Sequence, residues 1–330
     1  DAQESRGLGD VYKRQPKHFL PINISGISED DFTFVYGFPG TTDEYLPASS
    51  IQQIKDVIDP ARINVRTIAL SHIDKKMRED DATRIAYASK QARISNSHKK
   101  WIGEVLGLNR SKAVEKRQQY EQEFMNRIAK NPKLKGEYSN IISELNQVNK
   151  ANQDYNLAYT MYSETFFSNS ETFRMALTLN NILNAVGQKN YAETKAKALN
   201  TVASMHKDYN PELDKTISSD LADNYFKVVP QNLLPTTTAA NIKTALGNSV
   251  INGTKKINGQ SVLGNIKTLA ENDAEFIKAL KEDALIAQIR LILDANQTKV
   301  TPTYLANQDK INKLMRTYCL LYTSDAADDS

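Results

Sequence analysis

Cysteine is nearly absent from this chain of 330 residues, because Cys319, close to the C-terminus, is the only one. A single thiol excludes a disulfide within the chain, and it excludes a metal site built on several cysteine ligands. Residues 16–318 contain no cysteine at all, which also excludes a cysteine nucleophile in that part. The lack of cysteine does not identify the cellular compartment.

Long apolar runs and a strong excess of one charge are also missing. No apolar stretch reaches the roughly 20 residues that a membrane-spanning helix requires, so the sequence predicts no membrane span. The formal net charge is +3, and acidic residues alternate with basic ones in segments such as 75–81. This mixture is typical of a solvated helix surface, and the sequence therefore predicts no nucleic-acid partner.

Known catalytic motifs are absent as well. The chain has no Gly-x-Ser-x-Gly elbow, no glycine-rich phosphate loop and no zinc motif. Its histidines are scattered, and none has the spacing of a metal ligand pair with another histidine or a carboxylate. The sequence therefore predicts no metal, no cofactor and no complete catalytic group within the chain. The histidines are His18, His72, His98 and His206.

Glycine and proline are scarce in the middle of the chain, since residues 61–229 contain only four glycines and two prolines. The pair Asp59-Pro60 is typical of the start of a helix, with the aspartate as N-cap. The sequence therefore predicts long helices from this point, with connecting loops at 230–238 and 253–259. The expected helices include Ser111 to Lys130, Glu171 to Leu183, Tyr191 to His206, Pro211 to Phe226 and Asp273 to Leu293.

One segment has the clearest helical periodicity. Between residues 138 and 166, aromatic and aliphatic side chains recur at steps of three, four and seven, which predicts a face buried against partner helices. We interpret these residues as part of a helical core. They are Tyr138, Ile141, Leu145, Val148, Tyr155, Tyr159, Tyr162 and Phe166.

The pattern before the helices is different. Residues 16–51 are turn-rich and extended, and the β-favouring run Phe32–Tyr36 is followed by the turn Gly37-Phe38-Pro39-Gly40. We interpret this part as a β-hairpin. A hairpin followed by helices alone would leave open strand edges and one bare face. We therefore expect the other strands of its sheet to lie outside the chain.

The sequences at the two ends of the chain do not resemble natural protein sequence. Residues 5–15 resemble the translation of a transposase adapter used in sequencing libraries, and residues 319–324 resemble the opposite strand of that element read in another frame. Such segments are set aside in reasoning about a fold. We predict that residues 1–15 and 319–330 are adapter-derived and not native.

A series of motifs runs through the first part of the remaining chain. They are Val35–Thr42 with Tyr45, Arg62–Arg66, Arg84–Lys90, Asn96, Ile102-Gly103 and Gly107-Leu108. In order and spacing they resemble the bacterial dipeptidyl-peptidases seven and eleven, a family of serine exopeptidases. Weaker matches continue to the end of the segment, at Tyr209-Asn210-Pro211, Asp214, Pro235, Leu314, Arg316 and Tyr318.

The resemblance implies a mainly α fold class for this chain. A β-hairpin remnant of a chymotrypsin-like double β-barrel, residues 16–55, would be followed by a large helical lid domain, residues 56–318. Such enzymes release dipeptides from the free N-terminus of peptide substrates with a Ser-His-Asp triad and no cofactor. By resemblance the triad lies outside the chain, so we expect the chain by itself to be inactive. The resemblance also implies a homodimer located in the periplasm or at the cell surface.

Asn96 is the one family functional position inside the chain, and the resemblance implies that it binds the amino terminus of the substrate. Asn is a poor helix former, and Asn96 shares a helix face with Ser89, Ala92 and Gly103, whose small side chains leave room. An amide oxygen can accept a hydrogen bond from an ammonium group. Without the resemblance, an exposed amide with no ligand is the simpler interpretation.

Two questions stay open at this stage. A helical adaptor or binding module with no catalytic parent is the alternative function, and it predicts that the hairpin is dispensable. For a peptidase parent, the sequence does not say whether acidic or hydrophobic residues are preferred at the cleavage position. Trp101, the single tryptophan, is expected to be a packing residue.

Overall fold

The computed structural model describes residues 21, 24–32, 34, 43, 45–249, 251, 256–257, 260–261 and 270–328. The chain divides into two units, Asp1–Glu44 and Tyr45–Ser330. In the first unit, residues 24–32 form turns, with a hydrogen bond of 3.3 Å from the Asp31 amide to the Ser28 carbonyl. The predicted β-hairpin lies mostly outside the described residues, because Thr33 and residues 35–42 are among those not described.

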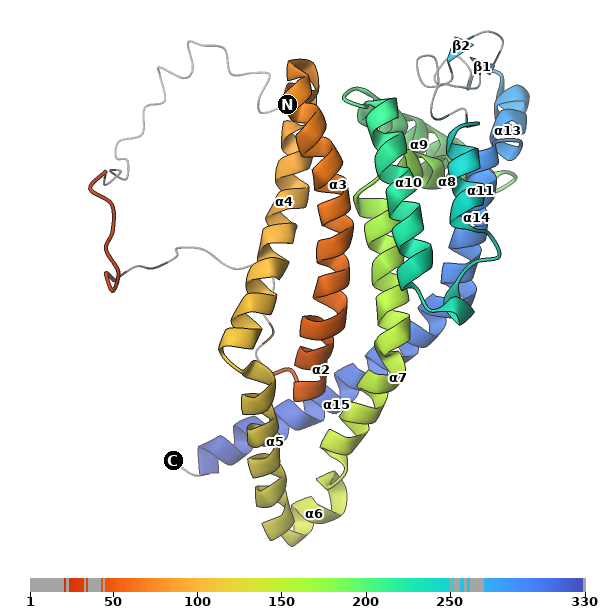
Figure 1. The fold of residues 1–330 in the computed structure, drawn as a ribbon. Coiled ribbons are helices and arrows are strands. Elements are labelled where there is room, and N and C mark those ends of the chain that lie inside the picture. The colour runs from red at the N-terminus through yellow and green to blue at the C-terminus, as the bar shows by residue number, and fades with distance from the viewer. Residues whose placement is uncertain are drawn as a thin grey trace, which may run out of the picture. The chain divides into compact units, whose positions relative to one another are not determined.

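The helices start earlier than the predicted boundary at residue 56. Helix α2 spans Ala48–Gln53, a π-helical turn η1 spans Ile54–Ile58, and α3 continues over Asp59–Glu79 (Figure 1). The Ala48 amide donates to the Glu121 carboxylate over 2.7 Å. A distant helix therefore caps α2, and the local sequence could not reveal this. The N-cap interpretation of Asp59 was wrong, because the helix runs on from η1 into α3 at Asp59 and the Asp59 side chain caps no backbone amide.

Helices α3 and α4 form an antiparallel pair, seen side by side in Figure 1. Helix α4 spans Asp81–Arg110, and its N-cap Asp80 accepts hydrogen bonds from the Ala82 and Thr83 amides at 3.2 and 3.0 Å. Lys112, in a left-handed conformation with φ of 51°, separates α4 from α5, which spans Ala113–Lys130. The predicted helix over 111–130 is thus confirmed to within two residues.

The predicted periodic segment forms α6 (Pro132–Tyr138), α7 (Ile141–Tyr162) and a second π-helical turn, η2 (Ser163–Ser168). Leu145 and Phe166 are fully buried, as the periodicity predicted. Figure 1 shows the long helix α15 (Thr301–Asp328) crossing α7. Tyr159 and Tyr304 stack there with ring centroids 4.3 Å apart.

The remaining elements complete the helical unit. They are α8 (Glu171–Ala185), α9 (Tyr191–His206), α10 (Pro211–Val228), η3 (Gln231–Leu233), α11 (Ala239–Leu246), the antiparallel strands β1 (Lys256–Ile257) and β2 (Gln260–Ser261), α13 (Asp273–Lys281), α14 (Ala284–Ala295) and η5 (Asn296–Val300). The helix predicted over 273–293 is broken, because the buried carboxylate of Asp283 caps α14 by accepting from the Leu285 and Ile286 amides.

Two hydrophobic cores hold the helices together. The larger core joins α3, α4, α7, α8, α10, α11 and α14 around buried side chains such as Ile73, Ile94 and Phe173. The smaller core joins α5, α7 and α15 and contains Phe124, whose ring meets that of Tyr318 edge-on at 5.0 Å. The fold is therefore mainly α, as predicted, and α4 lies against the larger core.

Candidate functional site

Asn96 lies in the middle of α4, on the face turned away from the core. Its neighbour Ile94 is fully buried, whereas Asn96 is exposed together with Ser89, Ala92 and Gly103. A side chain added at Gly103 would meet no atom within 4 Å. Within the described part of the chain, the Asn96 amide makes no hydrogen bond. The structure thus places the predicted residues on one open helix face with an uncommitted amide group.

The buried ion pair of Arg66 and Glu164 fixes this part of α4. The Arg66 guanidinium on α3 donates to both carboxylate oxygens of Glu164, from Nε over 2.9 Å and from Nη2 over 3.2 Å. Its third nitrogen, Nη1, donates to the Ile94 carbonyl over 3.3 Å. Bidentate pairs of this kind combine strength with a fixed geometry. Arg66 therefore connects η2 to the turn of α4 that carries Asn96.

Trp101 packs against the same arginine. The Arg66 guanidinium carbon lies 4.6 Å from the centroid of the Trp101 ring, and that of Arg62 lies 5.1 Å away. An arginine over an aromatic face gains about 0.5–1 kcal/mol or more as the pair is desolvated. Trp101 thus contributes to the α3–α4 interface, in agreement with the packing role expected from the sequence.

A second buried network surrounds Asp214 of α10. Its carboxylate accepts hydrogen bonds from the Glu171 and Thr172 amides at 3.1 and 2.7 Å, which caps the start of α8. The Lys90 ammonium of α4 lies 3.4 Å from Asp214 and 2.9 Å from Glu171. Burial alone would raise the pKa of Asp214, but Lys90 and the hydrogen bonds outweigh it and hold the pKa below its ordinary value.

Tyr87 extends this network along α4. Its hydroxyl donates to Glu171 over 3.2 Å and accepts from the Asn210 amide over 3.0 Å. Burial, with the nearby charges of Glu171 and Asp214, raises the pKa of Tyr87 far above its ordinary value. Tyr87 is therefore a neutral hydrogen-bonding group that links α4, α8 and the start of α10.

The carboxyl group of Asp59 has a strongly raised pKa. Burial, assisted by the charge of Glu104, raises its pKa from 3.8 to about 6, against the opposing influence of Arg62 and Lys100. One carboxylate oxygen accepts from Arg62 over 3.4 Å, and the other has no partner. A half-satisfied buried acid of this kind favours its protonated form.

The histidines do not assemble into a site. His72 contacts Asp220 over 2.8 Å, His98 contacts Thr67 over 2.9 Å, and His206 lies beside the Tyr209 ring. His18 lies outside the described residues. In the described ranges, no cluster of three or more His, Cys, Asp or Glu residues could hold a metal ion. No helix of those ranges is long and apolar enough to cross a membrane.

The chain is similar to known proteins over nearly all of its length. The family model described as Peptidase S46 matches residues 13–324. The chain belongs to the peptidase S46 family. This S46 chain is 36% identical over 307 residues to an Asp/Glu-specific dipeptidyl-peptidase of Capnocytophaga gingivalis. The match covers 92% of this chain and 43% of the relative. It is 31% identical over 221 residues to dipeptidyl-peptidase 7 of Porphyromonas gingivalis, covering 67% of the chain and 30% of the relative.

Solved structures share the fold of the S46 chain. The crystal structure of Porphyromonas endodontalis DPP11 in complex with the dipeptide Arg-Glu matches with a TM-score of 0.71 at 18% identity, over 94% of this chain and 44% of that one. The resemblance to dipeptidyl-peptidases seven and eleven is therefore confirmed. The S46 chain spans less than half the length of the curated relatives it matches.

Sequence reasoning missed the two buried networks that hold α4 in place. Arg66 and Glu164 are 98 residues apart, and Lys90 and Asp214 are 124 residues apart. Arg66 and Asp214 were noted only as members of matching motifs. A single sequence gives no signal for such pairs, although a basic residue on an otherwise apolar helix face, as at Arg66, indicates a buried partner.

Proposed function

We propose that this chain is the helical lid of a serine-type exopeptidase that releases dipeptides from the free N-terminus of peptides. The observation that supports the proposal most strongly is the family match over residues 13–324, together with relatives that are named dipeptidyl-peptidases. The relatives carry both Asp/Glu-specific and dipeptidyl-peptidase 7 names, so the proposal covers only their shared activity. On resemblance alone, we further propose a periplasmic or cell-surface homodimer with the triad outside this chain.

Asn96 is proposed to bind the terminal ammonium group of the substrate. The proposal is supported by the exposure of the Asn96 amide and by the room left by Ser89, Ala92 and Gly103 on the same face. A hydrogen bond with a charged partner contributes about 1.5–3 kcal/mol. Holding the free amino end at a fixed distance from the reacting groups would measure two residues to the scissile bond.

The first experiment uses the chain of 330 residues. The purified chain is incubated with fluorogenic dipeptidyl substrates, and we expect no release of the reporter above the buffer blank. Hydrolysis by the pure chain would contradict the proposal that the triad lies elsewhere.

The second experiment uses the complete peptidase that contains this chain. Product dipeptides with a free amino group and their N-acetylated forms are compared as competitive inhibitors. In the Asn96→Ala variant we expect the free-amine dipeptide to bind about tenfold to hundredfold more weakly, from the loss of one charged hydrogen bond, while the acetylated form is unaffected. Ser89→Ala, on the same exposed face, is the matched control. An Asn96→Ala enzyme that still prefers the free amine would contradict the assignment.

A further inference from the structure

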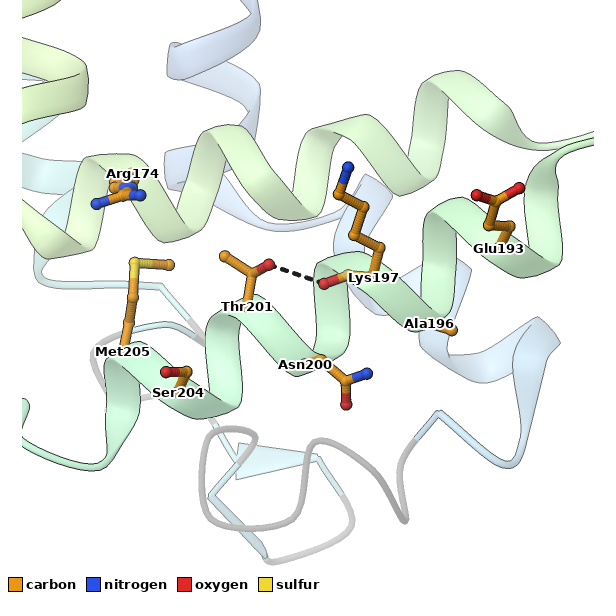
Figure 2. Close-up of a pocket in the computed structure, with 8 residues that line it drawn as sticks. All are labelled: Arg174, Glu193, Ala196, Lys197, Asn200, Thr201, Ser204 and Met205. Atoms are coloured by element: carbon orange, nitrogen blue, oxygen red, sulfur yellow. Dashed lines mark hydrogen bonds between the residues drawn. The ribbon is translucent and has the colours of Figure 1, made fainter. Parts of the chain in front are cut away.

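A polar groove runs between α8 and α9, on a part of the chain that the proposed function leaves unused. Figure 2 shows Arg174 on α8 and the other labelled residues on α9, with the Lys197 side chain reaching toward α8. The groove is open to solvent and has a volume of about 790 Å³. An adjoining hollow shares Arg174, Glu193, Lys197 and Thr201 and adds the exposed ring of Phe167.

The groove is rich in groups that bind a peptide backbone. Thr178 and Asn181 follow Arg174 along α8, and Thr194, Thr201 and Ser204 lie along α9. The Thr178 and Thr201 hydroxyls donate to the Arg174 and Lys197 carbonyls of their own helices, so they serve a peptide only as acceptors. The seven steps from Arg174 to Asn181 span about 10 Å of helix at 1.5 Å per residue. An extended peptide covers that length with about three residues.

Arg174 lines one end of the groove, and Arg93 of α4 reaches the neighbouring turn η2. Arg174 lies with its guanidinium carbon 5.3 Å from the centroid of the Phe167 ring. Arg93 of α4 donates only to the Ser168 carbonyl, over 3.4 Å. Neither arginine forms an ion pair with any residue that the structure describes. Burial, and then the charges of Arg174 and Arg66, lower the pKa of Arg93, while the charges of Glu171 and Glu164 oppose this shift.

The carboxylates near these arginines are already bound by other cations. Glu164 is held by both oxygens in the ion pair with Arg66, and Glu171 is bound by Lys90. Neither carboxylate forms an ion pair with Arg93 or Arg174, so both guanidinium groups can bind a further carboxylate. Planar arginine forks match the geometry of a carboxylate.

The charge of the groove is not uniform along its length. Glu193 lines the end near the α8–α9 connection, in the first turn of α9. Arg174 lies near the start of α8, at the opposite end of the antiparallel pair. An acidic side chain is therefore favoured at the Arg174 end and disfavoured at the Glu193 end.

We propose that the α8–α9 groove binds an extended peptide segment and that Arg174, with Arg93 beside it, binds the carboxylate of an acidic side chain of that peptide. The site takes a carboxylate and needs no free amino group, so it goes beyond the proposed function and does not depend on Asn96. A segment of about three residues fills the groove from the arginine end toward Asn181.

The test is an NMR titration of the isotope-labelled chain with two blocked peptides. One is N-acetyl-Glu-Ala-Ala-Ala-amide, and the other has Gln in place of Glu. Because both peptides are acetylated, the proposed ammonium site at Asn96 is not engaged, and failure here is separate from failure of the peptidase proposal. We expect the Glu peptide to bind about tenfold more tightly than the Gln peptide, which corresponds to one charge-assisted hydrogen bond.

Variants locate the binding. Arg174→Gln is expected to remove the preference for the Glu peptide, and Arg93→Gln is expected to reduce it. Arg84→Gln, an exposed arginine of the same helix as Arg93, is the control and should keep it. Circular dichroism checks that each variant is folded. Equal binding of the two peptides, no measurable binding, or an unchanged preference in folded Arg174→Gln would overturn the proposal. Binding of inorganic phosphate, but not of the Glu peptide, at Arg174 would overturn it as well.

Discussion

The buried carboxylate of Asp59 makes the stability of the helical unit depend on pH in a defined direction. The pKa of Asp59 is raised from 3.8 to about 6, mainly by burial and then by Glu104. An acid with a raised pKa in the folded state contributes stability that is fully present below its unfolded pKa. That contribution is lost as the pH rises through the folded pKa. Replacing Asp59 by Asn, which is neutral at every pH, removes this dependence.

The size of the effect follows from the two pKa values. A rise from 3.8 to about 6 corresponds to roughly 3 kcal/mol at 1.36 kcal/mol per pKa unit. About 2 kcal/mol of this is lost between pH 4.5 and pH 7.5, because Asp59 is already partly ionised in the unfolded chain at the lower pH. Near neutral pH the Asp59→Asn variant should therefore be more stable than the wild type by up to about 3 kcal/mol.

The assay is urea denaturation of both proteins, followed by circular dichroism at several pH values from 4.5 to 7.5. Only the difference between the two proteins is used, because other titrating groups then cancel. Asp56→Asn, at an exposed position one turn earlier, is the matched control and should follow the wild type within about 0.5 kcal/mol. A difference between wild type and Asp59→Asn that is constant with pH, or that grows toward acid, would refute the reasoning.

Three substitutions test how much the buried networks contribute to the free energy of unfolding, each by urea denaturation at pH 7. Asp214→Ala leaves the Lys90 ammonium short of a partner and uncaps α8, so we expect a loss of about 3–5 kcal/mol, and a loss below about 1 kcal/mol would contradict the network. Glu164→Gln leaves the Arg66 guanidinium buried without its carboxylate, with a similar expected loss. Tyr87→Phe removes two hydrogen bonds and should cost about 1–3 kcal/mol, whereas no measurable change would show that the hydroxyl is not needed.

Local sequence signals were sufficient for most helices and insufficient where distant residues decide the structure. The scarcity of glycine and proline and the apolar periodicity predicted α5, α9 and α10 closely, and α10 begins at a local cap, Asn210 followed by Pro211. The start of α2 was missed because Glu121 provides its cap from another helix. The break at Asp283 was missed because a single carboxylate restarts the helix there.

In the candidate site, too, local sequence signals predicted one part and could not predict the part that depends on distant residues. Periodicity alone placed Asn96 with Ser89, Ala92 and Gly103, and the structure confirms that these residues share an exposed face. The sequence could not predict what holds that face in position, since Arg66 and Glu164 are far apart in the chain. The cations at and near the α8–α9 groove were missed because Arg174 lies on α8 and Arg93 lies on α4, which reaches η2 through the Arg93 hydrogen bond to the Ser168 carbonyl.

The contacts of α2 also constrain the order in which the chain folds. The Ala48 amide binds Glu121, and the Gln53 side chain binds both the Asn149 carbonyl and the Asn156 side chain, partners that lie 73, 96 and 103 residues further along the chain. At about 5–20 residues per second, a ribosome needs roughly 5–20 seconds to add a hundred residues. During that interval the α3–α4 pair can form from its own neighbours, while the segment before it has no partner. Helix α2 can therefore dock only after the α3–α4 pair has formed, once α5 and α7 have been synthesised.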